Sequence, residues 1–224
     1  GLYGYLGPDG VWAIQPQYEF AGEFFDGSAQ ASISTGAGLI GLDGTWLVTP
    51  KYVYVETPGG SGKYRVAGTA TGLALIDNGT WQVEKTYESA FSHSSNGYLV
   101  ISSGDVSELI GPEGDTRFAL TDAYSISAWD AWEDRVVVNE GIWGESGYYL
   151  YDMDGNRVSE GFQWLVRLGG GYYQFATFEY VQAEYEDGAL VFNEQVPGTM
   201  RLGVVDSDGK VVIPAEYETL YALS

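Results

Sequence analysis

Short apolar runs separated by glycine-containing turns recur along the whole chain. In residues 4–19 and again in residues 38–52, an apolar run, an Asp-Gly turn and a second apolar run follow one another. After the turn glycines Gly10 and Gly44, a Trp comes two residues later, a Pro six later and a Tyr eight later. Two apolar runs around a glycine turn are typical of a β-hairpin. No segment keeps a helical period over a dozen residues, so the pattern predicts an all-β chain.

The hairpin pattern recurs in about six degenerate copies with a period of roughly 35 residues. Copy three keeps Trp81 and Tyr87 but has no proline, and the last copy carries Val211 in place of the Trp. Two weaker copies have their turns at 111–114 and 152–156. We expect one repeat domain over residues 1–224, with approximate copies at 1–35, 36–70, 71–105, 106–146, 147–200 and 201–224.

Each copy offers three or four short strands, because a further apolar run follows the tyrosine, as at 29–33 and 63–67. Pro16 and Pro50 have no N–H to donate to a sheet, so we expect the second hairpin strand to end at them. One copy cannot bury its own apolar face, and the copies must therefore stack. The sequence predicts an all-β fold of tandem repeats of short antiparallel strands. We expect a propeller-like ring of about six units, with an open β-hairpin array or solenoid as the alternative.

The repeat resembles a known family. The pattern Gly-aromatic-apolar, Asp-Gly, then Trp-apolar-apolar-x-Pro-x-Tyr, seen best in 4–18, 38–52 and 203–217, resembles the WG-repeat (KWG repeat) family of bacterial proteins. Residues 25–31 are similar to the strand that follows the Tyr in that family, whereas copies two to five lack the aromatic-Gly dipeptide. The family often occurs in exported bacterial proteins, sometimes beside cell-wall modules, and supplies no catalytic residues. The resemblance implies a non-catalytic bacterial module, extracellular or at the cell surface.

Charge and composition narrow the possible partners. The formal net charge is −21, from 10 basic and 31 acidic residues, and such a chain repels phosphate backbones and anionic membranes. The absence of cysteine excludes disulfides, zinc-thiolate sites and thiol catalysis. No apolar run approaches the roughly 18 residues of a transmembrane helix. We expect no cofactor, no nucleic-acid partner and no membrane insertion, and a protein or carbohydrate as the partner.

Aromatic residues outside the repeat register are the candidate ligand-binding residues. Trp129 and Trp132 alternate with carboxylates, and an exposed Trp beside acids can stack on a sugar while the acids bind its hydroxyls. The alternative is that these Trp residues, and likewise Trp143, fill a wedge between repeats. The insertion 177–200 is predicted to form a protruding hairpin, and insertions in repeat proteins often lie on the binding face. The alternative is an extended native sheet. The insertion contributes two candidates, Tyr180 and Tyr185.

Other chemical motifs favour structural roles. Segments 152–156 and 206–210 resemble fragments of a calcium loop, but the glycine comes too early and no Glu closes the loop, so hairpin turns are the preferred interpretation. His93 lies in the polar segment 92–97, expected to be a surface loop, and no Gly-x-Ser-x-Gly elbow is present. The leading hypothesis is a binding module for protein or glycan. A purely structural spacer is the alternative, and a glycoside hydrolase-like enzyme using two of the many carboxylates is the third hypothesis.

Overall fold

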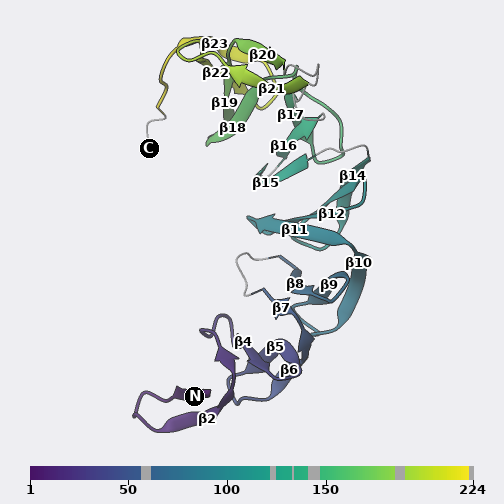
Figure 1. Ribbon diagram of the computed structural model, residues 1–224, viewed down its shortest axis with the longest axis vertical. Helices are drawn as coiled ribbons and strands as arrows, with labels where there is room; N and C mark the ends of the chain where they lie inside the picture. Colours follow the sequence, from purple (N-terminus) through teal and green to yellow (C-terminus); the bar gives the residue numbers. More distant parts are fainter. Residues whose placement is uncertain (57–61, 122–124, 133, 141–146, 185–189, 222–224) are drawn as a thin grey trace. The chain divides into compact units, whose positions relative to one another are not determined.

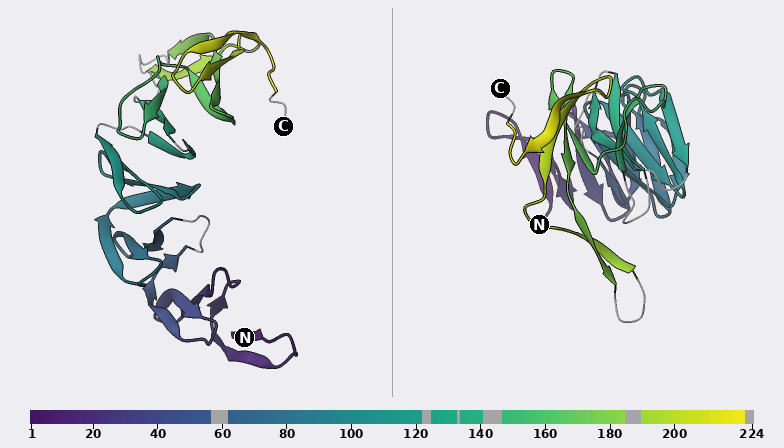
Figure 2. Two further views of the ribbon diagram at one scale, coloured as in Figure 1. Left: turned by 180° about the vertical axis from the view of Figure 1, so that it is seen from behind. Right: turned by 90° about the horizontal axis from the view of Figure 1, so that it is seen from above.

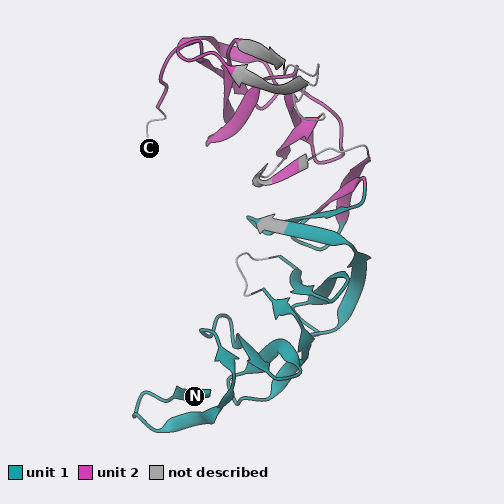
Figure 3. Cartoon of the chain, viewed as in Figure 1, with its two compact units in different colours: residues 1–104, 110–115 teal, residues 105–109, 116–224 magenta. Residues whose placement is uncertain are grey.

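The computed structural model describes residues 1–56, 62–121, 125–132, 134–140, 147–184 and 190–221. These residues form β-strands, turns and short connections, which confirms the predicted all-β class. No helix in these segments is long and apolar enough to cross a membrane. The chain divides into two compact units (Figure 3), unit 1 with residues 1–104 and 110–115 and unit 2 with residues 105–109 and 116–224. Closure of the sheets into a ring stays a prediction.

Unit 1 contains three antiparallel sheets in chain order (Figure 1). Sheet 1 is the hairpin β1 (Tyr3–Leu6) and β2 (Trp12–Tyr18). Sheet 2 has the order β3 (Phe20–Ala21), β4 (Ser28–Ile33), β5 (Gly36–Gly41) and β6 (Trp46–Tyr52). Sheet 3 contains β7 (Tyr54–Val55), β8 (Tyr64–Gly68), β9 (Gly72–Asp77) and β10 (Val83–Glu88).

Sheet 4 has the order β11 (Ala90–Ser95), β12 (Tyr98–Ser103), β13 (Val106–Ile110) and β14 (Thr116–Thr121), and the boundary between the units passes through it. Unit 2 continues with sheet 5, which contains β15 (Ser125–Trp132), β16 (Arg135–Glu140) and β17 (Gly147–Asp152). Sheet 6 has the order β18 (Trp164–Gly169), β19 (Tyr172–Thr177), β22 (Arg201–Asp206) and β23 (Val211–Tyr217).

The predicted insertion forms a separate hairpin between β19 and β22. Its strands β20 (Tyr180–Glu184) and β21 (Leu190–Gln195) pair antiparallel with each other and make a sheet of their own. In Figure 2 this hairpin extends away from sheet 6. The prediction of a hairpin is therefore confirmed, and the alternative of an extended native sheet is not what the chain adopts.

Each sheet after the first is built from two consecutive sequence copies. In sheet 2, strands β3 and β4 belong to copy one, whereas β5 and β6 belong to copy two. The same division holds in sheet 3, where β7 and β8 precede the hairpin of copy three. The last strands of one copy therefore pair with the hairpin of the next copy. This overlap ties successive copies together by backbone hydrogen bonds as well as by side-chain packing.

The spacing of proline and tyrosine that recurs in copies one, two and six coincides with a bulge, which corrects the expectation that proline ends the strand. In sheet 1, Tyr3 pairs with Tyr18 and Tyr5 with Ile14, so β2 advances four residues while β1 advances two. The same irregularity occurs in β6 and β23. A residue within a bulge need not donate to the ladder, so proline is tolerated there. The prolines concerned are Pro16, Pro50 and Pro214.

In copies one and two, the glycine that opens the hairpin is required by this bulge. A Cβ added to Gly38 would lie 2.3 Å from the carbonyl oxygen of Val48 and 3.0 Å from the nitrogen of Pro50. A Cβ on Gly4 would meet the corresponding atoms, at 2.5 Å from the oxygen of Ile14 and 2.6 Å from the nitrogen of Pro16. The bulged strand crosses so closely over its partner that no side chain fits between them.

Apolar cores lie between neighbouring sheets. Ile40 belongs to the core shared with sheet 1, whereas its neighbour Leu39 belongs to the core shared with sheet 3. Every residue of β5 after Gly36 is buried. A strand buried on both faces accounts for the nearly continuous apolar run in its sequence. The stacking that the repeat predicted is therefore present within unit 1. Unit 2 holds a comparable core between sheets 5 and 6, with Leu150 and Tyr173 among its members.

The hairpin turn is the same in five copies and different in the third. In copy one, the amide of Gly10 donates to the carbonyl of Gly7 and the amide of Gly7 donates to that of Val11. In copy three the turn is one residue longer, since the amide of Asp77 donates to the carbonyl of Gln82. Here Trp81 takes a left-handed φ of 59°, a conformation that costs a non-glycine residue about 1–2 kcal/mol. The sequence spacing of copy three did not indicate this change.

Candidate functional site

The contact between sheets 1 and 2 is the basic interface of the repeat. The hydroxyl of Tyr18 donates to the carbonyl oxygen of Gly44 over 3.1 Å. The ring of Tyr18 meets Trp46 edge-on, with centroids 5.7 Å apart. Ile14 and Tyr18 bury Ile40 completely, to 0% exposure. We call the surface of a sheet that carries Ile14 and Tyr18 its trailing face, and the surface that carries Ile40 and Trp46 its leading face.

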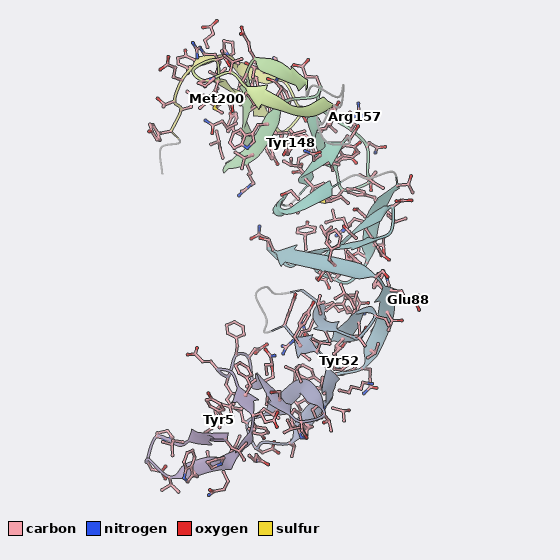
Figure 4. All side chains as sticks on the ribbon, in the orientation of Figure 1. Tyr5, Tyr52, Glu88, Tyr148, Arg157 and Met200 are labelled. Carbon is pink, nitrogen blue, oxygen red and sulfur yellow. The ribbon has the colours of Figure 1, made fainter. Side chains whose placement is uncertain are left out.

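The same interface recurs further along the chain. Tyr52, labelled in Figure 4, occupies in sheet 2 the position of Tyr18, and Trp81 of the next hairpin packs against its core. In unit 2, a Cβ on the turn glycine Gly155 would lie 2.9 Å from the Cβ of Phe118, which has the position of Ile14. A trailing face therefore receives the turn and the Trp position of the following hairpin.

The leading face of sheet 1 presents the same residue types to solvent. Leu6 is 59% exposed and Trp12 is 43% exposed, although their counterparts Ile40 and Trp46 lie in the inter-sheet contact. Leu6 pairs with Trp12 across the hairpin, as Ile40 pairs with Trp46. Val11 adds a further exposed apolar side chain. A shallow hollow beside them is lined by Gly7, Pro8, Asp9, Val11, Trp12 and Ala13.

The turn above this face has its hydrogen-bonding groups ordered. Asp9 accepts a hydrogen bond from the amide of Val11 over 3.1 Å. Gly10 has a φ of 77°, close to the 79° of Gly44. A Cβ on Gly10 would meet no atom within 4 Å, whereas one on Gly44 would touch Ile14 and Tyr18. Sheet 1 therefore has the turn geometry of a stacked sheet, on a surface that none of the described residues covers.

A buried arginine joins copies one, two and three. Arg65 is only 5% exposed, and its Nη1 donates to the hydroxyl of Ser28 while its Nε donates to the amide oxygen of Asn78, each over 3.1 Å. The guanidinium lies 5.3 Å from the ring centre of Trp81. Burial lowers the pKa of Arg65, and the charge of Asp26 opposes this shift. The cluster connects two sheets, and its neutral hydrogen-bonding partners are typical of a structural role.

Unit 2 contains a second polar cluster around Glu140. Arg157, labelled in Figure 4, forms an ion pair with Glu140 and lies 4.1 Å from the ring centre of Tyr149. Tyr151 donates its hydroxyl to the same carboxylate. Burial, followed by the hydrogen bond to Glu140, raises the pKa of Tyr151. Because an arginine and a tyrosine both bind this carboxylate, its role is structural: it connects β16 to the hairpin that begins with β17.

The aspartates of the two calcium-like segments bind their own turns. Asp152 Oδ1 accepts the amides of Asp154 and Asn156 over 3.0 and 2.8 Å, and the hydrogen bond from the side chain of Asn156 is the largest contribution lowering the pKa of Asp152. Asp206 accepts two turn amides in the same way. These contacts confirm the interpretation as hairpin turns. Among the residues that the structure describes, no group of three His, Cys, Asp or Glu side chains is placed to hold a metal ion.

The side chains of the aromatic residues proposed from the sequence lie outside the described part of the structure. Trp129 and Trp132 lie in β15 and Tyr180 in β20, but their side chains are outside the described part of the structure. Trp143 and Tyr185 lie outside the described residues. Their role in binding therefore stays a prediction. His93 lies in strand β11 and pairs with Val100, so the expected surface loop at this position is wrong. The polar run 92–95 follows a strand because its backbone pairs with the apolar strand β12.

Sequence reasoning missed the leading face of sheet 1. Trp12 is a repeat position, and repeat positions are normally buried between neighbours. Its exposure follows from the packing of sheets, which the repeat pattern alone does not give.

Comparison with known proteins agrees with the repeat. A family model described as WG containing repeat matches residues 3–33 and 203–224. A search of curated protein sequences finds no match. One similar solved structure is described as dihydro-heme d1 dehydrogenase NirN in complex with DHE, at 13% identity and a TM-score of 0.36, covering 61% of this chain and 36% of that chain. Another is described as a protein of unknown function from Bacteroides caccae, at 15% identity and a TM-score of 0.31, covering 86% of this chain and 79% of that chain.

The two matched segments share the structural features of the repeat, which copy two also has. Copies one and six share the bulge, the turn hydrogen bonds and the pairing register. The first match includes the exposed Leu6 and Trp12, and the second includes Tyr217. The predicted resemblance to the WG repeat is therefore confirmed at residues 3–33 and 203–224, which match the model of the WG-containing repeat.

Proposed function

We propose that the chain is a non-catalytic binding module that recognises a protein through the leading face of sheet 1. The observation that carries the proposal is the exposure of Leu6 and Trp12, whose counterparts Ile40 and Trp46 make the contact between sheets 1 and 2. An exposed apolar surface of this kind marks an interaction site when polar groups surround it. Here Asp9 and the turn backbone provide that polar border.

The residue types suit a protein partner. Trp is enriched where binding energy concentrates, because it brings a large apolar surface and loses little conformational freedom. Leu6 and Trp12 lie side by side on paired strands, so a partner can cover both at once. The net charge of −21 disfavours nucleic acid and anionic membranes as partners. Within the proposal, we place the module outside the cell or at its surface, as the family resemblance implies.

A glycan is the second candidate for the same face. The shallow hollow places Trp12 beside the carboxylate of Asp9, and this is the combination of ring and acid that stacks on a sugar and binds its hydroxyls. A glycan would depend on Trp12 and Asp9, whereas a protein partner would depend on Leu6 as well. The two candidates are therefore separated by the Leu6→Asp variant.

The test uses a photocrosslinking residue, p-benzoylphenylalanine, in place of Val11, with the same residue in place of Leu42 as the matched control. Both positions are exposed and lie at hairpin turns, but Leu42 belongs to sheet 2. Purified chain is irradiated in native cell-envelope extract, and the adducts are identified by mass spectrometry. The same variants are applied to a glycan array.

A protein adduct at position 11 that is missing at position 42 and lost on Leu6→Asp supports the protein-binding function. An array signal that is lost on Trp12→Ala but kept on Leu6→Asp replaces protein with glycan as the partner. If neither signal depends on Leu6 or Trp12, the proposed site is wrong.

A further inference from the structure

The last sheet of the chain offers the surface that complements the leading face of sheet 1. In sheet 6, Val204 pairs with Ile213 and Leu202 with Tyr217, in the register by which Tyr5 pairs with Ile14 and Tyr3 with Tyr18 in sheet 1. Ile213 and Tyr217 therefore take the positions of Ile14 and Tyr18 on a trailing face. Tyr217 is 47% exposed, whereas Tyr18, which is covered by the next hairpin, is 1% exposed.

The exposed part of this surface, at Tyr217, corresponds to the part of the trailing face of sheet 1 that meets Gly44 and Trp46. Further along the same face, Gln174 is buried and donates its side-chain amide to the carbonyl of Leu220 over 3.5 Å. Tyr18 donates its hydroxyl to the carbonyl of Gly44, and the turn at Gly10 has nearly the same φ as the turn at Gly44. The leading face of sheet 1 therefore offers to Tyr217 the groups that Tyr18 contacts on sheet 2. These groups are a glycine turn at Gly10, the ring of Trp12 and the aliphatic side chain of Leu6.

Resting on the proposed function, we infer that the protein bound by the leading face of sheet 1 is a second copy of this chain, which contributes the trailing face of its sheet 6. In this contact the Tyr217 hydroxyl of one copy donates to the Gly10 carbonyl of the other. Its ring meets Trp12 edge-on, and Ile213 covers Leu6. The contact joins two different surfaces, so it is head-to-tail and can propagate beyond a dimer.

Charge gives the association a characteristic salt dependence. Each copy carries a net charge of −21, and acidic residues flank both surfaces, with Asp9 beside Trp12 and Glu216 and Glu218 beside Tyr217. Like-charged copies repel one another, and salt screens that repulsion over a Debye length of about 8 Å at 0.15 M. The apolar contact itself is not weakened by moderate salt, so association strengthens as ionic strength rises.

The experiment is sedimentation velocity of the whole chain over a concentration series at low and high salt. Wild type is compared with Leu6→Asp, with Tyr217→Asp and with the matched control Leu42→Asp. Leu42 is 69% exposed and belongs to neither of the two surfaces. All three positions are exposed, so the variants are expected to fold, and circular dichroism and thermal melting check this. Each interface variant should raise the dissociation constant of self-association about tenfold or more, and the control should leave that constant unchanged.

Mixing the two interface variants decides the orientation. Leu6→Asp keeps its trailing face and Tyr217→Asp keeps its leading face, so the mixture forms one heterodimer that does not grow further, although neither variant associates alone. A wild type that stays monomeric at every concentration and salt overturns the inference, as does a mixture that fails to associate. If self-association fails but the crosslink at position 11 identifies a different protein, the proposed function still stands. If that crosslink is missing too, the proposed function is refuted as well.

Discussion

Gly38→Ala tests the account of the repeat's opening glycine. The backbone of Gly38 does not take a left-handed conformation, so the substitution introduces no conformational strain of its own. Its new methyl group would lie 2.3 Å from the carbonyl oxygen of Val48 and 3.0 Å from the nitrogen of Pro50. Both are backbone atoms, and Val48 is fixed by its pairing with Leu39. The clash is relieved only if the bulged strand moves away from β5.

The expected loss is about 2–3 kcal/mol of unfolding free energy, at the upper end of what overpacking a well-packed core costs. Gly10→Ala is the matched control. Gly10 has a φ of 77° but no atom within 4 Å of its added Cβ. The left-handed conformation costs alanine about 1–2 kcal/mol, offset by about 0.4–1 kcal/mol from the restricted unfolded chain. The control should therefore lose about 0–1.6 kcal/mol, less than Gly38→Ala.

Urea unfolding followed by Trp fluorescence and by circular dichroism measures both variants. Because repeat proteins can unfold in parts, coincidence of the two probes is checked before free energies are compared. Hydrogen exchange of the β5 and β6 amides then shows whether the loss is local to sheet 2. A Gly38→Ala variant as stable as wild type, or less affected than Gly10→Ala, would refute the role assigned to the bulge.

Five further substitutions, at four positions, probe unit 1 by urea unfolding. Tyr18→Phe removes a hydroxyl bonded to the next turn and should cost about 1 kcal/mol. Arg65→Lys loses two directed hydrogen bonds and should cost about 1–2 kcal/mol, whereas Arg65→Met should be closer to neutral because it removes a buried charge. Burial raises the pKa of Glu56, so the wild type becomes more stable as the pH falls through the pKa of the folded state. Glu56→Gln should therefore be more stable than the wild type at neutral pH and lose that advantage in acid. Hydrogen bonds, chiefly from the backbone of Thr80, lower the pKa of Asp77, so the pH dependence of its contribution to stability has the opposite sign. That contribution is present above the unfolded pKa of about 3.9 and is lost as the pH falls through the folded pKa. It should be missing in Asp77→Asn.

The sequence by itself determined the hairpin, the repeat and the resemblance to the WG repeat. These properties depend on local chemistry: a glycine such as Gly10 allows the turn, and alternating apolar residues fix which strands are formed. The Asp-x-Asp-Gly segments form turns for the same reason, since Asp152 and Asp206 accept hydrogen bonds from amides only a few residues away.

Only the tertiary structure decided how the copies share their sheets and which repeat positions stay exposed. Pro50 lies within β6 and not at its end because the partner strand permits a bulge there. His93 lies in a strand because β12 offers a backbone to pair with. Trp12 and Trp46 hold equivalent places in the repeat, yet Trp12 is exposed and Trp46 packs on Tyr18. The physical reason is that burial depends on what a neighbouring sheet places against a residue, and that neighbour is set by long-range packing which a local pattern does not encode.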